Sequence, residues 1–136
     1  MAGIVFFKTN NLRKIVEFYK SIGSKVWLDQ GDCVILQHDN FLFGFCERQG
    51  EIAKGWLLTF FYKTPQEVDA LYEKMKDRAE TKPQKNDKYN IYRFFSRDPE
   101  GRDLEFQTFL HEIEFNWHFY NQKQSNTPPS RTGLFP

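Results

Sequence analysis

Side chains that could ligate a metal or transfer a proton are few in this 136-residue sequence. It has three histidines, and His38 immediately precedes an expected hairpin turn. His111 and His118 flank two glutamates, but their spacing differs from metal-binding patterns such as HExxH. Metal-binding histidines also need an organised second shell around them. We therefore interpret the histidines as solvated or capping residues.

The two cysteines, Cys33 and Cys46, are expected to face each other. A two-residue turn at Asp39-Asn40, whose residue types tolerate positive φ, places them opposite each other in a hairpin. A disulfide is possible in this geometry, but a reducing compartment disfavours it and neither cysteine lies in a CxxC motif. Free cysteines are usually buried. We therefore predict two inert core thiols.

Glu105 is the remaining candidate for chemistry. Residues 103–109 alternate as a strand, which places Phe106 toward the helices and Glu105 on the opposite face. Glu105 would then bind a ligand, or act as a general base if its pocket is apolar. Alternatively, it pairs with Arg93 or Lys8 across the sheet, because a buried acid must find a partner.

The elements that position these residues occur twice. Thr9-Asn10-Asn11 precedes apolar residues at helical spacing, and Thr64-Pro65-Gln66-Glu67 precedes the same spacing with a capping-box pattern. An apolar strand comes before each helix, and strands separated by turn residues follow it. We predict strands at about 3–9, 25–29, 33–38, 41–47, 56–62, 89–96 and 103–109, a short strand within 80–88, and helices ending near 23 and 77–79.

Composition favours one globular domain whose partner is a small molecule. The net charge is +1, with basic residues scattered among carboxylates, which excludes nucleic acids and acidic membranes as electrostatic partners. The longest apolar runs are shorter than a bilayer span, and the start lacks the basic leader of a signal peptide, so we predict a cytoplasmic protein. Fifteen Phe, six Tyr and three Trp supply a large apolar area for the core.

Two stretches resemble the vicinal oxygen chelate superfamily, namely Phe18-Tyr19 with Ile22-Gly23 and residues 98–106, which read Asp-Pro-Glu-Gly-Arg-Asp-Leu-Glu-Phe. That superfamily includes glyoxalase I, extradiol dioxygenases, fosfomycin-resistance enzymes and bleomycin-resistance binding proteins. The resemblance implies an α+β fold in which two βαβββ modules form a curled mixed sheet around a cavity.

The resemblance covers a glyoxalase/bleomycin-resistance-like domain at residues 1–110, with modules at about 1–50 and 51–110. Residues 111–136 form a C-terminal extension. Its aromatic residues Phe115, Trp117 and Phe119 alternate with polar residues, which predicts an extra strand or an arm laid on the body. An exposed aromatic arm is also a candidate dimer contact. By composition, residues 122–136 are flexible.

Metal-dependent members hold a divalent ion on the first and last strands of the modules. The resemblance carries those positions to Ile4, Gly44, Leu57 and Glu105, of which three are non-ligands. A catalytic divalent ion normally needs about three protein ligands. We therefore predict no cofactor and disfavour a metal, and the sequence leaves open whether the protein is an enzyme.

The cavity face combines aromatic and apolar residues with a few polar groups, which suits a small-molecule pocket. By alternation its predicted members are Phe6, Lys8, Ile35, Gln37, Leu42, Thr59, Phe61, Arg93, Phe95 and Glu105. The ligand-binding residues among them are Phe6, Lys8, Gln37, Thr59, Phe61, Arg93, Phe95 and Glu105, and Glu105 is the candidate catalytic residue.

We predict a metal-free small-molecule binding protein that forms a homodimer. One alternative is a metal-dependent or Glu-base lyase, isomerase or dioxygenase of the same superfamily. Another is a protein-interaction module that acts through the C-terminal arm.

Overall fold

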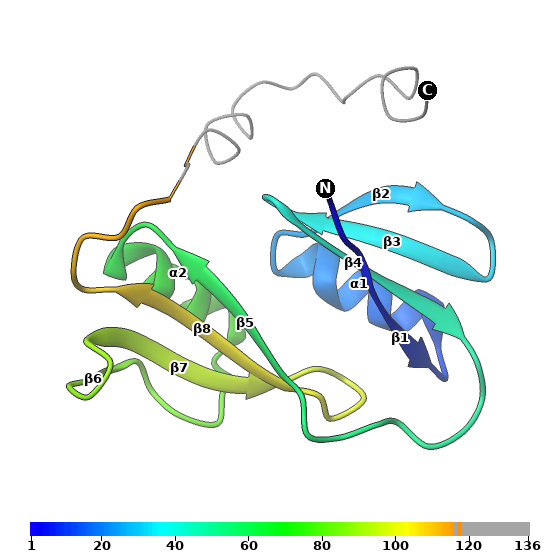
Figure 1. Cartoon of the computed structure of the whole chain (residues 1–136). Helices are drawn as coiled ribbons and strands as arrows, with labels where there is room; N and C mark the ends of the chain where they lie inside the picture. The colour runs from blue at the N-terminus through cyan, green and yellow to red at the C-terminus, as the bar shows by residue number, and fades with distance from the viewer. Residues whose placement is uncertain (116, 118–136) are drawn as a thin grey trace.

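A computed structural model, which describes residues 1–115 and 117, contains two successive βαβββ modules (Figure 1). Module one consists of β1 (Val5–Thr9), α1 (Leu12–Ser21), β2 (Lys25–Asp29), β3 (Cys33–His38) and β4 (Phe41–Glu47). Module two consists of β5 (Leu57–Tyr62), α2 (Pro65–Met75), β6 (Gln84–Asn86), β7 (Ile91–Arg97) and β8 (Asp103–Phe109). The predicted α+β fold of two modules is confirmed.

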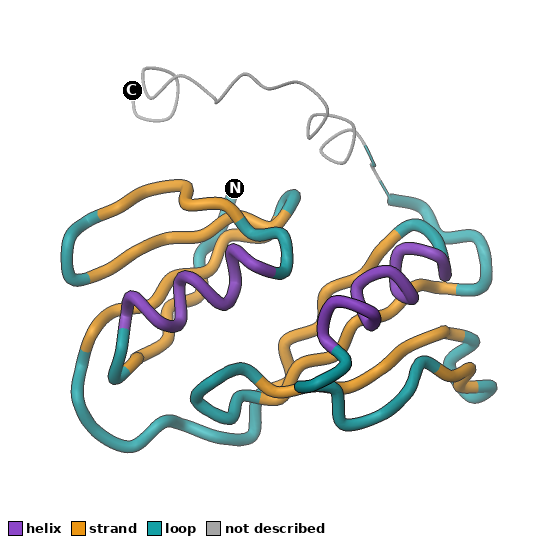
Figure 2. The backbone as a smooth tube through the Cα atoms, turned by 180° about the vertical axis from the view of Figure 1, so that it is seen from behind, coloured by secondary structure: helices purple, strands orange, loops and turns teal. Residues whose placement is uncertain are grey.

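Each module has a four-stranded mixed sheet, with strand orders β1-β4-β3-β2 and β5-β8-β7-β6. The first and last strands of each module pair in parallel, and the other pairs are antiparallel. Phe6 lies opposite Gly44 in module one, and Thr59 lies opposite Glu105 in module two. Both helices lie on the same side of the two sheets, so each sheet keeps one helix-free face (Figure 2).

Local sequence signals begin and end the helices. The side chain of Asn11 caps α1 by accepting a hydrogen bond from the Lys14 amide, and Gly23 follows the helix with a φ of 112°. Thr64 and Glu67 form the predicted capping box at the start of α2. That helix ends at Met75, a few residues before the predicted end.

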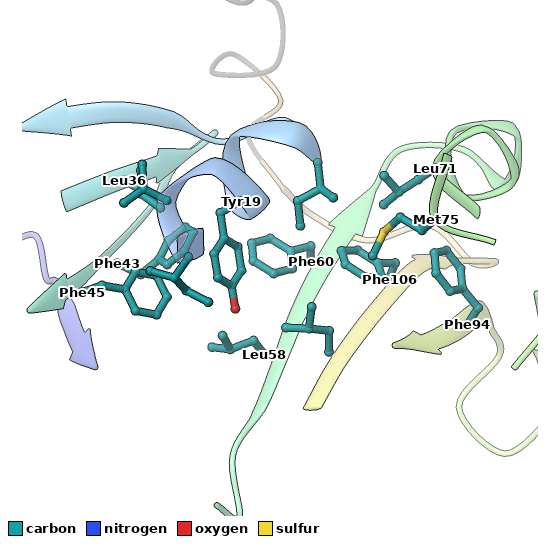
Figure 3. Packing of buried hydrophobic residues seen from close by; sticks show 14 of the residues in the cluster. Tyr19, Leu36, Phe43, Phe45, Leu58, Phe60, Leu71, Met75, Phe94 and Phe106 are labelled. Carbon is teal, nitrogen blue, oxygen red and sulfur yellow. The ribbon is translucent and has the colours of Figure 1, made fainter. Parts of the chain in front are cut away.

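Buried residues of both modules form one hydrophobic core (Figure 3). The ring of Phe60 from β5 stacks on Phe106 at 5.6 Å and lies 5.9 Å from Phe43 and 6.5 Å from Tyr19, both in module one. Because buried aromatic side chains remove a large area from water, these contacts join the two helix-covered faces into a single folding unit.

The turn between β7 and β8 joins the modules through buried polar contacts. Asp98 accepts a hydrogen bond from the Tyr19 hydroxyl at 2.7 Å and pairs with Arg102 at 3.0 Å. Glu100 accepts hydrogen bonds from the Thr9 hydroxyl and the Asn10 amide. Arg102 also donates to the carbonyl of residue 8. The segment 98–102, which carries much of the superfamily resemblance, therefore holds the modules together.

Cys33 and Cys46 lie directly opposite each other on β3 and β4, as the turn at Asp39-Asn40 predicts, but a disulfide joins them. The prediction of two free thiols is therefore wrong. The strand register places their Cα atoms 4.0 Å apart, which brings the two sulfur atoms together. Disulfides are typical of oxidising compartments, so the cysteines do not support the cytoplasmic prediction.

Within residues 1–115 and 117, no helix is long and apolar enough to cross a membrane.

Candidate functional site

The helix-free face of module two gathers five of the predicted ligand-binding residues, in the middle of the sheet. Glu105 on β8 lies between Thr59 on β5 and Phe95 on β7, and Arg93 lies two residues from Phe95 on the same strand. Phe61 lies two residues beyond Thr59 and is therefore on the same face.

Glu105 is 5% exposed, and both of its carboxylate oxygens have protein partners. Oε1 accepts a hydrogen bond from the Thr59 hydroxyl at 2.9 Å, and Oε2 pairs with the Arg93 guanidinium at 3.0 Å. The guanidinium also lies over the Phe95 ring, 4.7 Å from its centroid. These contacts compensate the burial of the carboxylate, so Glu105 has the partner that the alternative interpretation requires.

The other three predicted ligand-binding residues lie on module one, apart from this group. Phe6 and Lys8 are on β1, and Gln37 is on β3. Among the described residues, no hydrogen bond, ion pair or ring contact links their side chains to Glu105. The predicted set is thus divided between the helix-free faces of the two sheets.

The four superfamily metal positions do not fit a divalent ion. Glu105 has the one donor side chain among them, and its oxygens are already bonded to Thr59 and Arg93. At Gly44, an added Cβ would lie 2.6 Å from the Phe6 ring, so this ring occupies the space of a ligand side chain. The other two positions are the exposed apolar residues Ile4 and Leu57.

Neither described histidine provides an alternative metal site. His38 is buried on the helix-covered face, 4.7 Å from the Phe60 ring, with Nδ1 3.1 Å from the Ser24 hydroxyl. His111 is exposed, and His118 lies outside the described residues. Across residues 1–115 and 117, no group of three or more His, Cys, Asp or Glu side chains is arranged to hold a metal.

An aromatic pocket lies beside Glu105, between the β3–β4 turn, β5 and the C-terminal extension. The volume of this cavity is about 50 Å³. The residues that line this aromatic pocket are His38, Asp39, Asn40, Phe41, Thr59, Phe60, Phe61, Phe115 and Trp117. Thr59 connects this pocket to Glu105, because Thr59 lines the pocket and its hydroxyl donates a hydrogen bond to the Glu105 carboxylate.

The described part of the extension closes one side of the pocket. Phe115 and Trp117 have ring centroids 4.9 and 5.8 Å from that of Phe61, and 4.7 Å from each other. Phe115 and Trp117 therefore lie against module two, and neither residue is in a strand. The predicted roles of Phe119 and of residues 122–136 lie outside the described residues.

Sequence reasoning found Thr59 and Phe61 but missed the rest of the pocket. The alternation at Phe115 and Trp117 was visible as a sequence signal, yet nothing in it indicated that these rings would meet Phe61. The sequence predicts only a turn for Asp39 and Asn40. Their position against β5 depends on how the two modules pack.

The described lining of the aromatic pocket contains one carboxylate. Asp39 is one of its nine described lining residues, and none of the nine is Lys or Arg. The influence of this carboxylate reaches the neighbouring Tyr62 hydroxyl. Burial, then Asp39 and Glu67, raise the pKa of Tyr62 well above its usual value.

The fold is shared with several solved structures. A glyoxalase/bleomycin resistance protein/dioxygenase family enzyme from Burkholderia phytofirmans is 18% identical, with a TM-score of 0.70 over 79% of this chain and 97% of that one. A lactoylglutathione lyase from Agrobacterium tumefaciens is 16% identical, with a TM-score of 0.65 over 79% of this chain and 92% of that one. A glyoxalase/bleomycin resistance protein/dioxygenase from Nocardioides is 14% identical, with a TM-score of 0.66 over 85% of this chain and 87% of that one.

Neither the protein-family models nor the curated proteins contain a match to this sequence. The solved structures nevertheless show that the chain shares the fold of these glyoxalase/bleomycin resistance/dioxygenase proteins, which is the kind of fold that the resemblance predicts. The activities in their names are those of the proteins compared.

Proposed function

We propose that this protein binds a small organic molecule in the aromatic pocket and does so without a metal. The observation that carries the proposal is the position of this pocket beside a carboxylate that already has its partners. Thr59 and Arg93 hold both oxygens of Glu105, while the aromatic walls nearby enclose free volume. Pockets of this composition bind through apolar contact, with a few polar groups that set orientation.

The same contacts argue against the enzymatic alternatives. Metal chemistry on this fold needs several ligand side chains, and Glu105 is the single one at the four superfamily positions. A general base must accept the substrate's proton, whereas Glu105 is buried and engaged in an ion pair. Bleomycin-resistance binding proteins, which the sequence resembles, use this fold without a metal.

Tryptophan fluorescence tests this proposal directly, because Trp117 lines the pocket. We expect a screen of small organic compounds against chelator-treated protein to yield saturable fluorescence changes and a raised melting temperature. Trp117→Phe should abolish the fluorescence change. The matched variant Trp56→Phe should retain it, because Trp56 is exposed and contacts Phe7 of module one instead.

A metal titration tests the metal-free part of the proposal. We expect calorimetry with Fe(II), Mn(II), Ni(II) and Zn(II) to show no one-to-one binding to chelator-treated protein. Tight binding that is lost in Glu105→Gln would contradict the metal-free proposal and favour the enzymatic alternative. The homodimer and the cytoplasmic location stay predictions, which sedimentation and cell fractionation would test.

A further inference from the structure

A second cavity lies in module two, at the end of the sheet where β5 and β8 begin and β7 ends (Figure 1). Its lining includes Trp56, Leu57, Phe95, Glu80 and Asp103, and we call it the Trp56 groove. We propose that this groove binds a neutral carbohydrate, at a site separate from the aromatic pocket and independent of the function proposed for that pocket. Three features carry this proposal: the size of the groove, the exposed indole of Trp56 and the balanced charges around it.

The Trp56 groove has the size of a small-molecule site. Its volume is about 350 Å³, and sites for small organic ligands typically measure about 300–1,000 Å³. A neighbouring pocket of about 150 Å³, beside the turn at 98–102, shares Gly55, Trp56 and Asp103 with the groove. Because Trp56 lines both cavities, they adjoin at its side chain. This arrangement suits a ligand of two linked rings.

The indole of Trp56 is held at the groove with much of its surface free. It makes an edge-to-face contact with the Phe7 ring, with centroids 6.0 Å apart, and the residue is 50% exposed. The exposed Leu57 and the partly buried Phe95 add apolar surface to the lining. A sugar ring can cover such a surface with its C–H groups while its hydroxyl groups stay at the edge, where they can form hydrogen bonds.

Charged side chains beside the indole keep part of their hydrogen-bonding capacity. Nε of Arg97 lies 3.0 Å from Oε1 of Glu80 and donates a hydrogen bond to Oδ1 of Asp103 at 3.1 Å. Among the described residues, Oε2 of Glu80, Oδ2 of Asp103 and the Nη atoms of Arg97 form no hydrogen bond within the protein. All three side chains are exposed, so a ligand can reach these acceptors and donors.

The balance of charge favours a neutral ligand. The described lining of the groove and of the neighbouring pocket contains three acidic and three basic side chains, namely Glu80, Glu100 and Asp103, and Lys54, Arg97 and Arg102. A hydroxyl group both donates and accepts, so adjacent hydroxyls can bond to a carboxylate and to a guanidinium at once. A charged ligand would instead meet a like charge beside each opposite one.

Disaccharides test the groove, and two analogues separate the apolar face from the hydroxyl groups. We would titrate the full chain by calorimetry with cellobiose, maltose and N,N′-diacetylchitobiose. Cyclohexanol keeps an apolar ring with a single hydroxyl, whereas sorbitol keeps many hydroxyls without a ring. We expect at least one disaccharide to bind with a Kd of about 1 mM, at least about tenfold more tightly than either analogue. Glucosamine and glucuronate, which are charged, should bind no more tightly than glucose.

Matched substitutions locate the binding. Trp56→Ala removes the exposed indole and should weaken disaccharide binding about tenfold, whereas Trp117→Ala, in the aromatic pocket, should leave the Kd unchanged. Asp103→Asn keeps the shape of the side chain but removes its charge, and should weaken binding about fivefold. The matched variant Asp32→Asn, which breaks an exposed pair with Arg48 on module one, should have no effect. Melting temperatures would confirm that all variants fold.

The possible results have distinct meanings. If cyclohexanol binds as tightly as the best disaccharide, the groove is a general apolar site and the inference is wrong. It is also wrong if glucosamine or glucuronate binds more tightly than glucose, or if no disaccharide binds at about 20 mM. Binding that Trp117→Ala abolishes and Trp56→Ala leaves intact would contradict the inference but support the proposed function. A failed compound screen at the aromatic pocket would overturn the proposed function and leave the inference about the Trp56 groove standing.

Discussion

The buried ion pair between Asp98 and Arg102 gives the sharpest stability prediction. Their side chains are 0% and 2% exposed, and they join at 3.0 Å. Oδ1 of Asp98 accepts two backbone amides within its own turn, and Oδ2 accepts the Tyr19 hydroxyl and the Arg102 guanidinium. In Asp98→Asn the turn can keep its two amide contacts. The guanidinium, however, would face a donor instead of a charged acceptor.

The expected cost follows from what Arg102 retains. Breaking a buried ion pair by removing one partner costs about 3–5 kcal/mol. Arg102 still contacts Glu100 at 3.2 Å and the carbonyl of residue 8, so we expect the lower end, about 3 kcal/mol. For a domain of this size that lowers the melting temperature by roughly 10–15 °C.

Urea denaturation of Asp98→Asn and of a matched variant measures this cost. The matched variant Asp103→Asn breaks the ion pair between Asp103 and Arg97, whose side chains are 51% and 58% exposed respectively. Because this pair is exposed, its loss should lower the free energy of unfolding by less than about 1 kcal/mol. The role assigned to the β7–β8 turn would be refuted if the two variants lost equal stability. An Asp98→Asn loss below about 1 kcal/mol would refute it as well.

Three further predictions concern other parts of the fold. A thiol titration of denatured, unreduced protein should find no free Cys33 or Cys46, and reduction should cost about 3 kcal/mol, since the bridge closes a short loop; free thiols would contradict the disulfide. The pKa of Glu100 is lowered, because hydrogen bonds from Thr9, Asn10 and Arg102 outweigh the opposing effect of burial. The ionised carboxylate therefore stabilises the fold above about pH 4.5, and this contribution is lost as the pH falls through the lowered pKa of the folded state. In denaturation experiments at decreasing pH, the difference in stability between wild type and Glu100→Gln should therefore shrink. An unperturbed Glu100 would give a difference that does not change with pH. Gly44→Ala should lower the free energy of unfolding by about 1 kcal/mol or less, because the Phe6 side chain is 49% exposed and its ring can move away from the new Cβ. In a Phe6→Ala background the same substitution should have no cost. An equal loss of stability in that background would mean that the new Cβ clashes with another residue.

Local signals in the sequence determined most of the fold. Thr64 and Glu67 specify the start of a helix wherever the chain places it, because a capping box involves residues three apart. Asp39-Asn40 specifies a two-residue turn, and the turn sets the register that opposes Cys33 and Cys46. Alternation likewise placed Glu105 away from the helices, because strand side chains alternate strictly between faces.

The candidate site depended on contacts between distant segments, which no local signal describes. Alternation put Glu105 and Arg93 on one face, but their ion pair and the Thr59 hydrogen bond depend on side chains meeting across three strands. The sequence showed an aromatic extension, and the folded chain alone decided that Trp117 would meet Phe61 rather than solvent. Secondary structure follows from neighbours along the chain, whereas a pocket follows from how whole modules pack, and packing energy is shared among many residues.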